Sequence, residues 1–189
     1  IGCGFFALNH MHAWAQTAGI GIVAVCDSDR AKAERMAGAF GIPQVFCDAA
    51  TMLAGVPLDV VDIATTVGSH RALVELAAAH GVAAICQKPI AETMADAGAM
   101  VAACARAGVP LIIHENFRWQ RPFLVMREIV EQGRIGRPHF ARFSFRHGFD
   151  NYGNQPYLRQ IERFAIMDVG LHLFDLARLF MGEVATLSC

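Results

Sequence analysis

The chain has 189 residues, of which 54% are hydrophobic and only 17% are charged, and its formal net charge is −1. This composition excludes an intrinsically disordered chain, because such chains are polar and highly charged. It also argues against a nucleic-acid partner, since proteins that bind nucleic acid present a basic surface. We expect no membrane partner, because polar residues interrupt every apolar run before it is long enough to span a bilayer.

Residues 1–116 alternate between short apolar runs and longer stretches with helical periodicity. The short runs predict strands, and the longer stretches predict helices between them. Strands are expected at residues 21–26, 58–65, 82–86 and 110–114, and helices at residues 8–18, 29–40, 70–80 and 95–107. Gly81 and Gly108 are expected to end the last two helices. Strands that are apolar on both faces and alternate with helices indicate a doubly wound parallel sheet, so we expect one α/β domain over residues 1–116.

The pattern changes after residue 116, where arginine becomes frequent. It predicts a helix at 122–132, a turn at 133–138, a half-buried strand at 139–147, a polar loop at 150–156 and an apolar helix at 167–180. We expect residues 117–189 to form an incomplete second α+β domain. Because the chain begins at Ile1 on a glycine motif and ends at Cys189 within a new apolar segment, we expect a fragment of a longer protein.

The cysteines are widely spaced and form no CxxC pair. This spacing favours small buried side chains in a reducing compartment over a metal site or a disulfide framework. The interpretation covers Cys3, Cys26, Cys47, Cys86, Cys104 and Cys189. We therefore expect a cytoplasmic protein without a bound metal.

The first motif, Gly2-Cys3-Gly4-Phe5-Phe6-Ala7, has the pattern G-x-G-x-x-A between a strand and a helix. The first glycine allows a tight turn, the second lets the backbone approach a pyrophosphate, and the small last residue lets the helix pack against the strand. Phosphates would bind at the helix N-terminus, where peptide N–H groups and the helix dipole attract anions. An ordinary strand-to-helix turn is the alternative interpretation.

Asp27 follows the next predicted strand, at about the spacing of an acidic residue that binds the ribose hydroxyls of a dinucleotide. A carboxylate there favours NAD, because it repels the 2′-phosphate of NADP. Arg30 lies close by and weakens this preference, so NADP stays an alternative cofactor. Together with the glycine motif, Asp27 predicts a dinucleotide-binding site.

Gln87-Lys88-Pro89 directly follows the predicted strand at 82–86. Ligands of doubly wound sheets bind beyond the carboxyl ends of the strands, so Lys88 is a candidate for proton transfer or substrate orientation. An exposed lysine in a turn is the alternative interpretation.

Asp168, His172 and Asp175 recur at spacings of four and three residues, which places them along one stripe of the last predicted helix. Apolar residues and glycine surround them, so the stripe predicts the wall of a cleft. An ordinary amphipathic helix is one alternative. A metal pair of Asp168 and His172 is another, but it lacks an obvious third ligand.

Taken together, these motifs resemble those of the Gfo/Idh/MocA family of oxidoreductases. The matching segments follow the family's order over essentially the whole chain: GCGFFA at 2–7, Asp27, TTVGSH at 65–70, QKP at 87–89, ENFRWQRP at 115–122 and DVGLHLFDLARLFMG at 168–182. The resemblance implies an N-terminal Rossmann domain and a second domain with a large, mostly antiparallel sheet. It implies hydride transfer between a nicotinamide cofactor and a sugar, polyol or related hydroxyl compound.

The resemblance also implies roles for individual residues. Lys88 matches the lysine of the family's E-K-P motif, and Asp168 and His172 match its D-x-x-x-H pattern, so these three are the expected catalytic residues. Expected cofactor contacts are Gly2, Gly4, Phe5, Phe6, Ala7, Asp27, Arg30, Thr65, His70, Gln87 and Lys88. Expected substrate contacts are Asn116, Arg118, Asp168 and His172, with a structural role as the alternative for Arg118.

The chain departs from the family pattern at two places. Gln87 stands where the family usually has glutamate, and the loss of that negative charge is expected to favour the neutral amine of Lys88. Thr65-Thr66-Val67 replaces the usual T-P-N, which puts the local cofactor contacts in question.

In the expected mechanism, His172 removes the hydroxyl proton as general base and Lys88 stabilises the developing alkoxide. Asp168 positions the substrate or His172. Two alternatives stay open: a dinucleotide-binding sensor without catalysis, and an inactive fragment. The full-length protein is expected to be a homo-oligomer.

Overall fold

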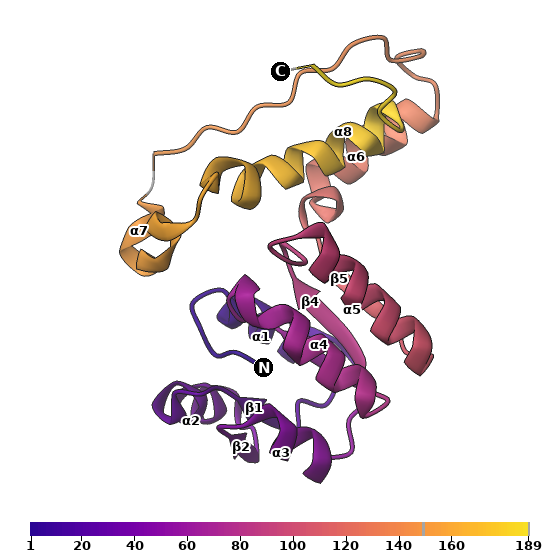
Figure 1. Ribbon diagram of the computed structural model, residues 1–189. Helices are drawn as coiled ribbons and strands as arrows, with labels where there is room; N and C mark the ends of the chain where they lie inside the picture. The colour runs from indigo at the N-terminus through magenta and orange to yellow at the C-terminus, as the bar shows by residue number, and fades with distance from the viewer. Residues whose placement is uncertain (149, 189) are drawn as a thin grey trace. The chain divides into compact units, whose positions relative to one another are not determined.

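The computed structural model describes residues 1–148 and 150–188, and the chain divides into two compact units, Ile1–His114 and Glu115–Cys189. In the first unit, short strands alternate with helices (Figure 1). Its elements are α1 (Ala7–Gln16), β1 (Ala24–Cys26), α2 (Arg30–Phe40), β2 (Gln44–Phe46), α3 (Ala49–Gly55), β3 (Val60–Ile63), η1 (Val67–Ser69), α4 (His70–Ala79), β4 (Ala83–Gln87), α5 (Met94–Ala107) and β5 (Leu111–His114).

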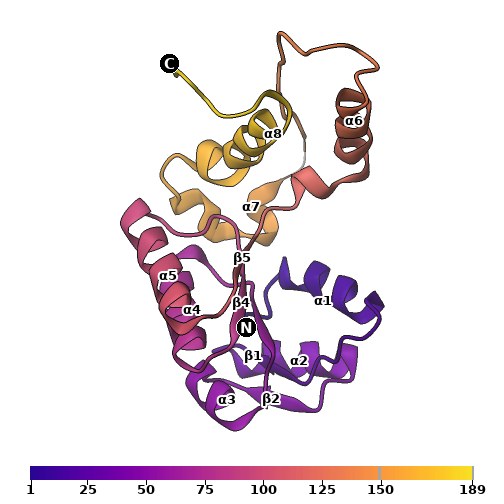
Figure 2. The same ribbon diagram turned by 90° about the vertical axis from the view of Figure 1, so that its right-hand side faces the viewer.

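The strands of the first unit pair in parallel, β1 with β2 and β3 with β4 with β5. The start of the chain joins the two groups, because the N–H of Gly2 donates to the carbonyl of Cys26 and the N–H of Ala64 donates to the carbonyl of Ile1, each at 2.8 Å. Helices α4 and α5 cover one face of these strands, and α1 and α2 lie on the other (Figure 2). The predicted doubly wound parallel sheet is confirmed.

Burial of both sheet faces explains the apolar composition of the strands. One core cluster contains the fully buried side chains Ile63 of β3, Cys86 of β4, Val74 of α4 and Met100 of α5. A second cluster packs α1 and α2 against β1. Since both faces of the strands are covered, their continuous apolar runs need no membrane. No helix within residues 1–148 and 150–188 is long and apolar enough to cross a membrane.

Element ends differ modestly from the prediction. The strand predicted at 21–26 begins only at Ala24, where pairing with β2 begins. Strand β2 and helix α3 were not predicted, because three paired residues and a seven-residue helix are too short to show a periodicity. Gly108 ends α5 in the left-handed conformation, as expected.

Five of the cysteines are free thiols, and the prediction that they are buried is wrong for Cys47, which is exposed after β2. Cys3, Cys26, Cys86 and Cys104 are buried. Cys189 lies outside the described residues.

The second unit is helical over the residues that the structure describes. Its elements are η2 (Phe117–Trp119), α6 (Arg121–Glu131), α7 (Asn151–Asn154), η3 (Pro156–Gln160), the π-helix η4 (Ala165–Gly170) and α8 (Leu171–Met181). The strand predicted at 139–147 is wrong, since this segment is mostly exposed and carries no strand pairing. Its alternating pattern suits a strand, but a strand also needs a hydrogen-bonding neighbour, and the described part of this unit contains none.

Two further differences concern the end of the chain. The loop predicted at 150–156 contains the short helix α7. The helix predicted at 167–180 begins as the π-helix η4 and continues as α8. A π-turn inserts one extra residue into the helical repeat and is frequent at functional sites.

Gly2 allows the start of the chain to pass close to the end of β3. Its φ is +89°, and a Cβ on Gly2 would lie 2.7 Å from the carbonyl oxygen of Ala64. Gly4, two residues later, has nothing within 4 Å of its would-be Cβ. Only the first glycine of the motif is therefore required by packing within the unit.

We expect Gly2→Ala to lower the unfolding free energy by about 1–3 kcal/mol, because the new methyl group meets main-chain atoms and the backbone conformation is strained. Gly4→Ala is the matched control and should cost less. Urea denaturation of the two variants in the full-length protein measures the difference, and equal destabilisation by both would contradict the steric argument.

Candidate functional site

The glycine turn leads into α1, and no side chain caps the first peptide N–H groups of this helix. Phe6 stands at the N-cap of α1, and no side chain caps this helix end. The N-terminus of a helix without a cap presents peptide N–H donors and the positive end of the helix dipole. With Gly4 exposed beside it, this turn has the chemistry of a pyrophosphate-binding site.

Asp27 lies directly beside the glycine turn. Its Oδ2 accepts a hydrogen bond of 2.7 Å from the N–H of Cys3, and its Oδ1 accepts one of 2.9 Å from the N–H of Asp29. The half-buried carboxylate is thus fixed at the end of β1, next to the glycine turn. This is the place where an acidic group binds the ribose of a dinucleotide.

Arg30 is paired on the surface, whereas Cys3 is buried. The exposed guanidinium of Arg30 donates to Glu34 at 2.7 Å, and this hydrogen bond raises the pKa of Arg30. Burial raises the pKa of the Cys3 thiol to about 11, so Cys3 stays protonated at neutral pH. The structure therefore gives Arg30 a partner on its own helix.

Thr65 and His70 lie at the carboxyl end of β3. The Cγ2 of Thr65 would be 2.9 Å from a Cβ on Gly2, which places Thr65 against the glycine turn. His70 is 1% exposed, with Nδ1 3.0 Å from the carbonyl oxygen of Pro89 and Nε2 3.2 Å from that of Thr65. His70 thus fastens the loop after β3 to the loop after β4.

Gln87 ends β4 and is 7% exposed. Its Oε1 accepts the backbone N–H of Lys88 at 2.7 Å, and its Nε2 lies 3.1 Å from the Nε2 of His10. The ring of Phe6 meets the ring of His10 edge to face at 5.4 Å. Gln87 thereby connects the Lys88 loop to α1 just behind the glycine turn.

A half-buried carboxylate, that of Asp62, contacts His10 from β3. Asp62 of β3 accepts hydrogen bonds from the Nδ1 of His10 at 2.8 Å and from the Nε1 of Trp14 at 2.6 Å. Burial alone would raise the pKa of Asp62, but these hydrogen bonds outweigh it and hold the pKa below its ordinary value. Asp62 is therefore ionised at neutral pH.

In the second unit, Glu115 holds His172 in one orientation. The Nδ1 of His172 lies 2.6 and 2.7 Å from the two carboxylate oxygens of Glu115, and the side chain of His172 is 5% exposed. The His172 ring stacks on Phe117 at 4.0 Å with an interplanar angle of 2°. Because the carboxylate accepts the hydrogen bond from the Nδ1–H, this tautomer has its lone pair on Nε2, which is the form of a general base.

The other second-unit candidates differ in their surroundings. Arg118 donates to both carboxylate oxygens of Asp175 on α8, a bidentate pair that favours the structural alternative for Arg118. Asn116 is half-buried immediately before η2. Asp168 is half-buried in the π-helix η4 and has its own interactions.

Sequence reasoning assigned no role to four side chains of these clusters: His10, Asp62, His114 and Glu115. His10 has a detectable signal, since it follows Ala7 by three residues and shares the buried face of α1. Glu115 belongs to the ENFRWQRP segment, but a pairing across 57 residues has no local signal.

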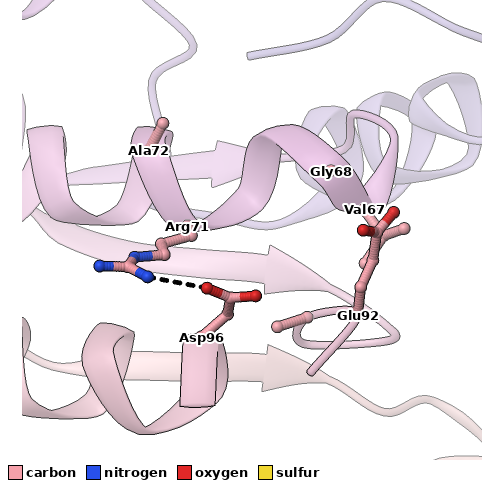
Figure 3. A pocket seen from close by; sticks show the side chains of 7 residues that line it. Val67, Gly68, Arg71, Ala72, Glu92 and Asp96 are labelled. Carbon is pink, nitrogen blue, oxygen red and sulfur yellow. Dashed lines mark hydrogen bonds and ion pairs between the residues drawn. The ribbon is translucent and has the colours of Figure 1, made fainter. Parts of the chain in front are cut away.

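A surface pocket of about 220 Å³ lies elsewhere on the first unit (Figure 3). The ion pair of Arg71 with Asp96, 2.8 Å long, lies within it. Its lining residues are Val67, Gly68, Arg71, Ala72, Ala91, Glu92 and Asp96. The pocket is smaller than typical ligand sites and includes neither the glycine turn nor Lys88, so the turn is the better candidate site. Among the described residues, no group of three side chains could hold a metal ion.

The doubly wound sheet, the open glycine turn and the fixed carboxylate of Asp27 define the class as a dinucleotide-binding protein with a Rossmann fold. Residues 1–115 match the Gfo/Idh/MocA oxidoreductase family with its NAD-binding Rossmann fold, and residues 123–189 match the C-terminal domain of that family. The chain belongs to the Gfo/Idh/MocA family.

Several relatives are similar over the whole chain. A D-apiose dehydrogenase of Rhizobium rhizogenes is 54% identical and one of Paraburkholderia graminis is 55% identical; the match covers 100% of this chain in both, and 54% and 50% of those proteins. An oxidoreductase of Agrobacterium radiobacter, crystallised with NAD+, L-tartaric acid and magnesium, is 54% identical with a TM-score of 0.94 over 97% of this chain and 54% of that one. The chain thus spans about half the length of these relatives.

The lowered pKa of Asp62 predicts that the unfolding free energy falls as the solution becomes more acidic. Because the folded pKa lies below the ordinary value near 3.9, the carboxylate stabilises the fold above that pH, and this contribution is lost as the pH falls through the folded pKa. Asp62→Asn should lower the unfolding free energy by about 1–3 kcal/mol at pH 7 and flatten its fall in acid.

Urea denaturation of the full-length protein between pH 7 and pH 3 measures both effects. Asp59→Asn, at an exposed position of the same segment, is the matched control and should behave like the unchanged protein. An Asp62→Asn variant with the original acid dependence would contradict the assignment.

Proposed function

We propose that the full-length protein containing this chain is an NAD-dependent dehydrogenase that oxidises a hydroxyl group of a sugar. The observation that carries the proposal is the Glu115–His172 pair, which supplies an oriented base in a family with an NAD-binding domain. The names of the 54–55% identical relatives favour D-apiose, or a sugar closely related to it, as the substrate.

The residues of the glycine turn fit NAD. Gly2 and Gly4 would allow the backbone to approach the cofactor, the uncapped start of α1 would hold its pyrophosphate, and Asp27 would offer a carboxylate to its ribose. The negative charge of Asp27 favours NAD over NADP, and Arg30, engaged with Glu34, adds little to counter it. The remaining proposed cofactor contacts are Phe5, Phe6, Ala7, Thr65, Gln87 and Lys88, with His70 acting through the two loops that it joins.

When bound, NAD supplies the acceptor for a hydride. His172 takes the substrate's hydroxyl proton on Nε2, and the carboxylate of Glu115 stabilises the imidazolium that results. Lys88 stabilises the negative charge that develops on the substrate oxygen. Asp168 and Asn116 orient the sugar, whereas Arg118 supports the site by holding Asp175.

The proposal also covers the location and the assembly of the protein. The free thiols suit a reducing cytoplasm. A homo-oligomer of the full-length protein is the proposed assembly.

Lys88→Met should lower kcat by about 10²–10⁴-fold and weaken the affinity for NAD much less, since methionine keeps most of the apolar stem of the side chain but loses the charge that stabilises the developing alkoxide. NAD reduction with D-apiose in the full-length protein gives kcat, and fluorescence titration with NADH gives the cofactor affinity. Undiminished turnover would remove Lys88 from the catalytic set.

Glu115→Gln should lower kcat by about 10²-fold or more, because the amide oxygen still accepts the Nδ1 proton but cannot stabilise the imidazolium. Glu115→Leu, which loses the hydrogen bond as well, should be slower still. Steady-state kinetics of both variants with D-apiose tests this order. If Glu115→Gln keeps the original kcat, the carboxylate has no part in the proton transfer.

A further inference from the structure

Four polar side chains, two of them buried and two half-buried, form a continuous chain of hydrogen bonds across the first unit, which we call the buried chain. They come from four elements: Asp62 of β3, His10 of α1, Gln87 of β4 and His114 of β5. Asp62 bonds His10 at 2.8 Å, His10 lies 3.1 Å from the amide nitrogen of Gln87, and that nitrogen lies 3.4 Å from the Nδ1 of His114. The two imidazole rings are 4.2 Å apart, so Gln87 reaches both from the same side chain.

The neighbouring backbone fixes which way the Gln87 amide points. The N–H of Lys88 can only donate, so the Gln87 atom 2.7 Å from it must be the oxygen. The amide nitrogen then faces the two histidines and donates to both.

This orientation fixes the protons of His10. Its Nε2 accepts from the amide of Gln87, so the ring proton is on Nδ1 and points to the carboxylate of Asp62. The Nδ1 of His114 likewise accepts and carries no proton.

We propose that Gln87 is a positioning residue that holds the backbone of Lys88 while keeping the buried chain of Asp62, His10 and His114 in one fixed protonation state. The inference rests on the role of Lys88 in the proposed function. An amide can neither take up nor release a proton at neutral pH, so it links Lys88 to α1 without passing charge between them.

A carboxylate of the same shape could not do this. Its oxygen would face two unprotonated ring nitrogens, so His114 would have to move its proton to Nδ1, or one of the rings would have to take up a second proton, to satisfy it. The chain of hydrogen bonds would then hold a negative charge next to Lys88, and the positions of the histidine protons would change. Glutamine thus keeps both the charge beside Lys88 and the positions of these protons fixed.

The other ionisable groups around this chain do not replace Gln87 in that role. The Cys86 thiol, beside Gln87 on β4, has its pKa raised to about 12 by burial, so it stays neutral. His70 bonds the carbonyl of Pro89 on the far side of Lys88.

Histidine NMR tests the proton positions without any need for turnover. In the full-length protein labelled with ¹⁵N-histidine, His10 should carry its proton on Nδ1 and none on Nε2 at neutral pH. In Gln87→Glu, a histidine of this chain should change its tautomer or take up a proton. Gln44→Glu, which adds the same charge at an exposed position on β2, is the matched control and should leave the His10 signals unchanged.

Kinetics test the consequence for Lys88. The pH profile of kcat/KM for the sugar should move by about one pH unit in Gln87→Glu and keep its shape in Gln44→Glu. Gln87→Leu, which releases Lys88 without adding charge, should lower kcat by about tenfold or more while the profile keeps its midpoint.

Two results would overturn the inference: a protonated Nε2 of His10 in the unchanged protein at neutral pH, or a Gln87→Glu variant with unaltered histidine signals and pH profile. Failure of the proposed function looks different. The unchanged protein would then reduce no NAD with any sugar, while the NMR measurement would still decide the protonation of His10.

Discussion

The contact between Gly2 and the main chain at Ala64 is the constraint on which the first unit depends. Because Gly2 has no side chain, the start of the chain can pass between β1 and β3 and hydrogen-bond to both. That passage joins two small groups of strands into one surface and points the following turn toward α1. The carboxyl ends of β1, β3 and β4 consequently bring Asp27, Thr65 and Gln87 to the same part of the unit.

Most of this arrangement could be predicted, because it depends on local patterns. Apolar runs bounded by glycine predict the parallel strands, and the spacing of Gly2, Gly4 and Asp27 predicts the cofactor turn. What periodicity misses is the partner of each polar side chain. Asp62 lies within an apolar strand and reads as an interruption, yet its carboxylate is held by residues 48 and 52 positions away. Such pairings depend on tertiary packing, which a local pattern does not contain.

In the second unit, by contrast, local patterns predicted features that the structure does not have. The segment 139–147 has the alternation of a strand and still forms none, because alternation describes the two faces of a strand and not its hydrogen-bonding neighbour. The expected stripe of Asp168, His172 and Asp175 is likewise divided, since Glu115 holds His172 and Arg118 holds Asp175. Spacing on a helix predicts which residues share a face, whereas the partners that approach the face decide what each one does.

The buried ring of His70 ties together two loops that lie on different sides of α4 in the sequence. Its two nitrogens contact the carbonyls of Thr65 and Pro89, which flank the Gly2 contact and Lys88. A shift of either loop therefore carries the other with it or breaks a contact of His70. The segment beside Gly2 and the loop that carries Lys88 are thus held to one another through a single buried imidazole.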